Sequence, residues 1–174
     1  MDPLFPAPCS TLLLDRKGGT LAASVAPDGQ WRMPASDSIP ARFAQCLIAF
    51  EDRHFRSHIG IHVPSLVRAA QQNRKAGRVV SGGSTITMQL ARMARGHQPR
   101  TTINKLVEML MALRLEIRYD KESILALYVA NAPFGGNVVG LEAAAWRWFG
   151  HAPHQLGWAE CATLAVLPNA PARI

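Results

Sequence analysis

The first part of this chain alternates short apolar runs with turn-forming residues. Residues 10–34 (STLLLDRKGGTLAASVAPDGQWRMP) contain two turn segments, Lys17–Gly19 and Pro27–Gly29, between apolar stretches. This pattern predicts a β-hairpin or three short strands. Residues 1–9 are rich in proline and are predicted to be a disordered segment or a linker.

From Ser38 onward, apolar residues recur at helical spacing, which predicts a mainly α-helical domain. We therefore expect two regions, residues 1–37 and residues 38–174. Proline near the start of a segment and glycine at its end set the helix limits. The predicted helices are Pro40–Asp52, Pro64–Gly77, Ser84–Gly96 with Ser84 as N-cap, Thr101–Tyr119, one capped by Asp120 that ends before Pro133, Gly140–Phe149 and Gln155–Leu167.

Composition indicates a globular and basic protein. The chain has 174 residues, 48% of them hydrophobic, and a net charge of +7, enough for one domain with a core. The charge suits an anionic partner such as phosphate, nucleic acid or a membrane, although many soluble proteins are as basic. Cys9, Cys46 and Cys161 fit neither a zinc site nor a disulfide framework.

The sequence shows no bilayer-spanning run and no signal peptide. It ends directly after an apolar helix, at LPNAPARI. We therefore expect either a cytosolic protein or, given this ending, part of a longer one.

The segment EDRHFRSHIG (residues 51–60) is the first candidate for chemistry. Glu51 and Asp52 follow an apolar helix, where the negative end of the helix dipole disfavours acids. A half-desolvated carboxylate has a raised pKa and can accept a proton near neutrality. In the alternative interpretation these are solvated charges, Phe55 is a core residue and His58 holds the loop.

The second candidate is GGSTITMQLARM (residues 82–93). Its glycines permit close backbone approach, and free N–H groups at a helix start favour an anion. Gln89 and Arg92 are spaced to face one ligand. The cations Arg92, Arg95, Arg100 and Lys105 form either a phosphate clamp or an ordinary solvated face.

Glu108 is predicted to lie within the apolar face of the fourth helix. The helical positions that define this face are Ile103, Leu106, Val107, Leu110, Leu113 and Ile117. A carboxylate in such surroundings needs a partner or a function. Lys105, three residues earlier, is a candidate partner, and a second catalytic carboxylate is equally consistent.

Together these motifs resemble the peptidoglycan glycosyltransferases of family 51, the lysozyme-like domain of class A penicillin-binding proteins, over residues 38–174. The family's first motif, Glu-Asp-x-x-Phe-x-x-His-x-Gly, matches residues 51–60 without a gap. The second, Gly-x-Ser-Thr-x-Thr-Gln-Gln-Leu, matches residues 82–90 except that Met88 replaces the first Gln.

The later motifs match less completely. Arg-Lys-x-x-Glu appears with Asn104 in place of the Arg, and in Ile-Leu-x-x-Tyr-Leu-Asn the last two residues are Val129 and Ala130. The segment APFGGN and the C-terminal run are most similar to the 1C branch of the class A penicillin-binding proteins.

The resemblance implies polymerisation of lipid II. Glu51 would be the general base that deprotonates the acceptor 4-hydroxyl, with inversion at the donor carbon and loss of undecaprenyl pyrophosphate. Glu108, also counted as catalytic, would orient Lys105 or a divalent ion, or assist the leaving group. The implied substrate-binding residues are Asp52, Phe55, His58, Gly82, Ser84, Thr85, Gln89, Arg92, Arg100 and Lys105.

The resemblance also implies a setting at the periplasmic face of the inner membrane. The family's N-terminal anchor helix and C-terminal transpeptidase domain are absent from this chain, so we expect a truncated protein. Expected partners are lipid II, the growing glycan chain, the membrane surface through residues 59–66 and other cell-wall synthesis proteins, but not nucleic acid. No cofactor is required, and Mg²⁺ or Mn²⁺ is a candidate ion.

Two alternatives remain open from the residues. One is a lysozyme-like peptidoglycan hydrolase or lytic transglycosylase, which needs no pyrophosphate clamp. The other is a catalytically silent scaffold that binds lipid II, since Met88, Asn104 and Ala130 depart from the family pattern.

Overall fold

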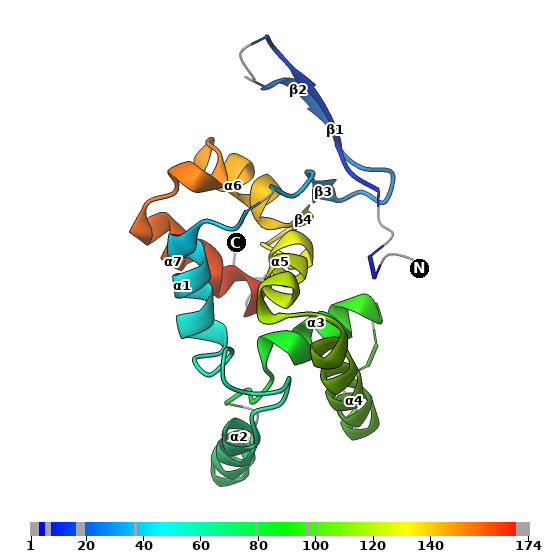
Figure 1. Ribbon diagram of the computed structural model, residues 1–174, viewed down its shortest axis with the longest axis vertical. Coiled ribbons are helices and arrows are strands. Elements are labelled where there is room, and N and C mark those ends of the chain that lie inside the picture. The colour runs from blue at the N-terminus through cyan, green and yellow to red at the C-terminus, as the bar shows by residue number, and fades with distance from the viewer. Residues whose placement is uncertain are drawn as a thin grey trace. The chain divides into compact units, whose positions relative to one another are not determined.

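The computed structural model describes residues 4–5, 8–16, 20–36, 38–78, 80–96, 98–99 and 101–169 (Figure 1). The described part is mainly helical with a small N-terminal antiparallel hairpin, as predicted. Its helices are α1 (Ala41–Glu51), α2 (Val63–Ala76), α3 (Ile86–Ala94), α4 (Thr102–Arg118), α5 (Lys121–Asn131), α6 (Leu141–Phe149) and α7 (Trp158–Val166). Its strands are β1 (Thr11–Leu14), β2 (Thr20–Ser24), β3 (Trp31–Arg32) and β4 (Val138–Val139), and two 3₁₀ turns are η1 (Pro153–Gln155) and η2 (Leu167–Asn169).

The strands form two small sheets. β1 and β2 pair antiparallel, with Thr11 opposite Ser24. The predicted turn at Lys17–Gly19 lies outside the described residues. The predicted third strand, β3, pairs in parallel with β4, so that Trp31 faces Val138. The sequence did not predict this pairing, because β3 and β4 are more than one hundred residues apart and no local pattern links them.

The chain divides into two compact units, which are described separately. The first comprises Met1–Phe50 and Val129–Ile174, and the second comprises Glu51–Tyr128. The predicted boundary between residues 37 and 38 is a different division and stays a prediction. Among the described helices, none is long and apolar enough to cross a membrane.

The core of the first unit is built around two aromatic rings. Phe43 and Phe134 are fully buried, and their ring centroids lie 6.1 Å apart. Trp148 donates its indole N–H to the Phe134 carbonyl over 2.9 Å. Cys161 is fully buried, as the apolar run around it predicts, whereas Cys46 is only half-buried.

In the second unit α3 packs against α4. The buried residues of α4 are Glu108, Ala112 and Leu115, whereas the apolar residues Ile103, Leu106, Leu110 and Ile117 are 56–87% exposed. At 3.6 residues per turn these two sets lie on opposite sides of the helix. The prediction that Glu108 lies within the apolar stripe is therefore wrong, although the same periodicity predicted the helix correctly.

Two predicted helix starts need correction. The N-cap of α3 is Thr85, whose hydroxyl accepts from the Met88 N–H over 3.1 Å, and not Ser84. The last long helix begins at Trp158 and not at Gln155. There the Glu160 carboxylate accepts from the Gly157 N–H over 2.7 Å, which stabilises the later start.

Candidate active site

Glu51 is the last residue of α1, and its side chain is half-buried. Gln89, on α3, donates its amide Nε2–H to the Glu51 Oε2 over 2.7 Å. The Gln89 Oε1 in turn accepts from the Tyr128 hydroxyl over 3.1 Å. The candidate base is therefore held by a residue of the second motif, and Gln89 contacts Glu51 directly.

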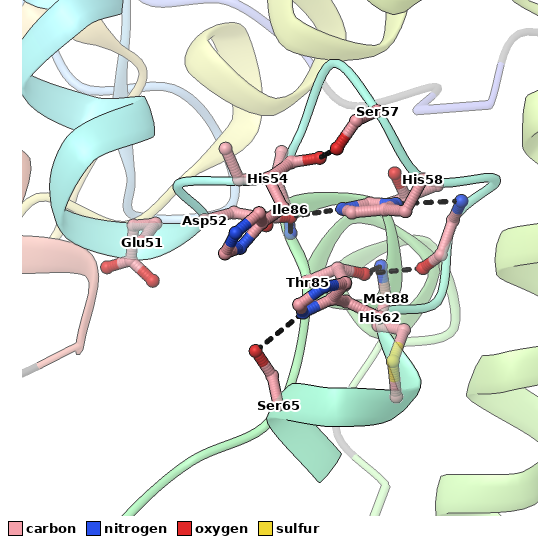
Figure 2. A network of polar contacts seen from close by, with 12 residues as sticks. Glu51, Asp52, His54, Ser57, His58, His62, Ser65, Thr85, Ile86 and Met88 are labelled. Carbon is pink, nitrogen blue, oxygen red and sulfur yellow. Dashed lines mark hydrogen bonds and ion pairs between the residues drawn. The ribbon is translucent and has the colours of Figure 1, made fainter. Parts of the chain in front are cut away.

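Asp52 lies next to Glu51 but is in a different environment (Figure 2). Its Oδ2 accepts from the His58 Nε2 over 2.8 Å and from the backbone N–H of Ile86 over 3.1 Å. Ile86 is the first residue of α3, so a carboxylate of the protein itself occupies the helix start that the sequence predicted for a substrate anion. Asp52 thus ties the first motif to the second.

The His58 ring completes this connection. Its Nδ1 accepts from the Gly60 N–H over 3.0 Å, so the proton must lie on Nε2, which donates to Asp52. The Gly60 carbonyl accepts from the Thr85 hydroxyl over 2.6 Å. Asp52, His58 and Thr85 are all buried; Asp52 and His58 point toward each other, and the Thr85 hydroxyl points toward the Gly60 carbonyl (Figure 2). This arrangement supports a role in holding the loop rather than in contacting substrate.

Phe55 is fully buried, as expected for a core residue. The Lys121 ammonium lies 4.7 Å from the centroid of its ring. Lys121 also donates to the His58 carbonyl over 2.6 Å and to the Glu116 carboxylate over 2.7 Å. Sequence reasoning gave no role to Lys121 or Glu116, because the contacts of Lys121 with the first motif and of Glu116 with Thr87 join segments far apart in the chain.

Lys105 and Ser84, from the third and second motifs, lie together. The Lys105 Nζ donates to the Ser84 hydroxyl over 2.6 Å. The two glycines before Ser84 differ in their surroundings. A side chain on Gly83 would come within 2.9 Å of the backbone of Leu66, whereas Gly82 has open space around it. Gly83 is therefore the position that needs close approach, whereas a side chain at Gly82 would meet no other atom within 4 Å.

Of the other predicted cations, Arg92 and Arg95 are among the described residues. Arg95 donates to the Asn104 side chain over 3.0 Å. Asn104 stands where the family's third motif has an arginine, and here its side chain accepts a hydrogen bond from Arg95 instead. Arg92, on the last turn of α3, is half-buried. Arg100 lies outside the described residues.

Glu108 is 6% exposed and lies on the buried side of α4 with Ala112. Its predicted partner Lys105 is one turn earlier on the same helix. Among the described residues, no cluster of three or more His, Cys, Asp or Glu side chains is arranged to hold a metal ion. The candidate divalent ion beside Glu108 therefore stays a prediction.

Comparison with known proteins addresses the family directly. A family described as Transglycosylase matches residues 18–174. The chain belongs to the transglycosylase family. The resemblance inferred from the two motif segments is thus confirmed, and the match extends into the N-terminal hairpin.

Three relatives illustrate the range of this transglycosylase family. The chain is 41% identical to penicillin-binding protein 1C of Escherichia coli over 99% of its length, which supports the predicted similarity to the 1C branch. It is 43% identical to penicillin-binding protein 1A of Aquifex aeolicus over 79% of its length. It is 40% identical to the biosynthetic peptidoglycan transglycosylase of Burkholderia thailandensis over 76% of its length. The alignments cover 23, 19 and 52% of these relatives, so the chain spans at most about half of each.

Proposed function

We propose that this transglycosylase domain polymerises lipid II into β-1,4-linked glycan strands with release of undecaprenyl pyrophosphate. The observation that carries the proposal is the hydrogen bond from Gln89 to Glu51, which fixes a half-buried carboxylate in the unit that also holds the Lys105–Ser84 pair. The biosynthetic peptidoglycan transglycosylase named among the relatives supports the same reaction class.

Glu51 acts as the general base. Its carboxylate takes the proton of the 4-hydroxyl on the acceptor's N-acetylglucosamine, and the oxygen attacks the anomeric carbon of the donor's N-acetylmuramic acid. The bond from that carbon to the pyrophosphate oxygen breaks, and its electron pair leaves with the pyrophosphate. Attack from the opposite face converts an α-linked donor into a β-1,4 bond, as in other inverting reactions that use one base.

The leaving pyrophosphate needs positive charge more than a proton. Lys105 supplies it beside the Ser84 hydroxyl, and the resemblance adds Arg92 and Arg100 as further proposed cations. Gly82, exposed and without close neighbours, leaves room for substrate near the Lys105–Ser84 pair. Glu108 orients Lys105 or assists departure of the leaving group. No cofactor is required, and a divalent ion such as Mg²⁺ or Mn²⁺ is a candidate at Glu108.

The substrate's lipid places the reaction at a membrane surface. Ile59 and Val63 are 73 and 62% exposed, and they lie in and just after the first motif. These residues are the proposed contact with the outer leaflet of the inner membrane, on the periplasmic side. The glycan chain and other cell-wall synthesis proteins are the proposed partners there.

The test is an assay of the purified chain on labelled lipid II in detergent, with Glu51→Gln as the matched variant. We expect glycan polymer from the parent, and a loss of about a hundredfold or more with retained lipid II binding in the variant. Glu142→Gln is the control, because Glu142 lies in the other unit. Shortened glycan instead of polymer would indicate a hydrolase, and binding without any product would indicate a scaffold.

A further inference from the structure

Tyr128 is a buried polar group that the reaction described above does not use. It is 1% exposed, on α5, and its hydroxyl donates to the Gln89 side-chain oxygen over 3.1 Å. The other end of the same amide donates to Glu51 over 2.7 Å. Two hydrogen bonds therefore connect a buried phenol to the proposed base.

The direction of these bonds follows from the chemistry of the groups. A phenol O–H donates to the amide oxygen, and this leaves the amide N–H₂ to face the Glu51 carboxylate. Burial raises the pKa of the Tyr128 hydroxyl far above its usual range; the charge of Glu51 raises it further, and that of Arg92 opposes the shift. The hydroxyl therefore stays a donor throughout the working pH range.

Without the hydroxyl, Glu51 alone would set the orientation of the amide in this pair of bonds: an ionised carboxylate accepts only from the N–H₂ end, but a protonated carboxyl can also donate to the amide oxygen. The two ends of a glutamine amide have nearly the same shape but opposite polarity. An amide oxygen turned toward Glu51 would repel the carboxylate and favour its protonated form. A protonated carboxyl cannot accept the acceptor's proton.

We infer that Tyr128 is a positioning residue for Glu51, acting through the Gln89 amide to present a hydrogen-bond donor to the carboxylate. The inference rests on the proposed function, in which Glu51 is the general base. Tyr128 touches neither substrate nor reacting atoms in this role. It fixes the amide, and the amide fixes the carboxylate's orientation and favours its ionised form.

Tyr128→Phe removes the hydroxyl and keeps the ring. We expect kcat to fall about tenfold, as for loss of one buried hydrogen bond between neutral groups, with little change in KM. The acidic limb of the pH–rate profile should move to higher pH. Tyr119→Phe is the matched control, since Tyr119 is the chain's other tyrosine and lies half-buried at the end of α4.

A direct titration of Glu51 by carboxyl ¹³C NMR separates this inference from the proposed function, because it needs no turnover. The Glu51 carboxyl should titrate at higher pH in Tyr128→Phe than in the parent and in Tyr119→Phe. Gln89→Met should give the same direction of shift, and the double variant no further shift, because both residues act along one path. These results would stand even if the parent failed to polymerise lipid II, which would overturn only the function.

Two results would overturn the inference. One is a Glu51 titration in Tyr128→Phe and Gln89→Met that is unchanged from the parent. The other is a double variant whose shift is the sum of the single shifts, since Tyr128 would then act independently of Gln89. If Tyr128→Phe does not fold, an unchanged Glu51 titration in Gln89→Met still overturns the inference, because Tyr128 reaches Glu51 only through that amide.

Discussion

His58 donates a hydrogen bond to Asp52 over 2.8 Å, and the two side chains are only 5 and 6% exposed. The bond joins two residues of one short motif, and the same carboxylate oxygen also accepts from the first N–H of α3. The Asp52–His58 pair of the first motif is thus a structural clamp beside the proposed base. The side chain of Glu51, which precedes Asp52 in the sequence, points away from the imidazole rings of His54, His58 and His62 (Figure 2).

Asp52→Ala should destabilise the protein by about 2–5 kcal/mol, because it leaves the His58 and Ile86 N–H groups buried without an acceptor. The measurement is the free energy of unfolding in urea. Glu122→Ala is the control: it removes an ion pair with Arg56 whose side chains are 59 and 64% exposed. We expect the control to cost less than about 1 kcal/mol. Equal losses in the two variants would contradict the clamp.

Gly60→Ala tests the close approach of the first motif to α4. Gly60 has φ +86°, and a Cβ there would lie 2.9 Å from the Ala112 carbonyl oxygen. Gly77 also has positive φ, +62°, but open space around it. Gly77→Ala should therefore cost about 1–2 kcal/mol for the backbone conformation alone, and Gly60→Ala should cost clearly more. Similar unfolding free energies for the two variants would show that α4 yields to the added methyl group.

Much of the fold follows from local signals in the sequence. The helix limits near Thr101, Gly77 and Phe149 were predicted. Thr101 caps α4, where its hydroxyl accepts from the Asn104 N–H over 3.2 Å, and Gly77 and Gly150 end α2 and α6 in the left-handed conformation. These signals are readable because capping depends on residues close in sequence.

What the sequence did not reveal depends on long-range contacts. The apolar spacing of α4 identifies a helix but not which side is covered, and the side that is buried carries Glu108, Ala112 and Leu115 instead. Likewise, no local pattern shows that Asp52 caps a helix that begins 34 residues later. The surroundings of Asp52 and Glu108 therefore follow from the tertiary structure and not from the local sequence.

Lys105→Met tests whether the cation beside Ser84 handles the pyrophosphate. We expect weaker binding of a soluble lipid II analogue and a smaller dependence of that binding on salt, because one screened attraction is lost. Titrations at two ionic strengths measure both effects. Lys75→Met is the control, since Lys75 lies exposed in the last turn of α2 and its loss changes the net charge equally. If both variants behave alike, Lys105 belongs to an ordinary basic surface.

The double variant Ile59→Ser, Val63→Ser tests the proposed membrane contact. Exposed apolar side chains contribute to binding in proportion to the area they bury in the lipid, so sedimentation with anionic vesicles should fall. Trp158→Ser removes an apolar residue of comparable exposure, 57%, in the other unit, and it should sediment like the parent. Unchanged sedimentation of the double variant would remove this segment from the membrane contact.

The stacked rings of His54 and His62, 4.3 Å apart at their centroids, predict a stability that depends on pH. Desolvation lowers the pKa of His62 from 6.5, and the charges of His54, His58 and Arg68 lower it further, while Asp52 opposes the shift. Below pH 6.5 the unfolded chain therefore binds a proton at His62 more readily than the folded protein does. The free energy of unfolding should therefore decrease as the pH drops from 6.5 through the lower pKa of His62 in the folded protein. It should recover when the pH is raised above 6.5 again.

His62→Asn should reduce this acid-side loss of stability, because the group with the lowered pKa is gone. The measurement is the urea midpoint of parent and variant at several pH values between about 5 and 8, the range in which histidines titrate. His154→Asn is the control, since His154 is exposed and lies in the other unit. If His62→Asn follows the same pH dependence as the parent and this control, the acid sensitivity arises elsewhere and the histidine stack contributes nothing to it.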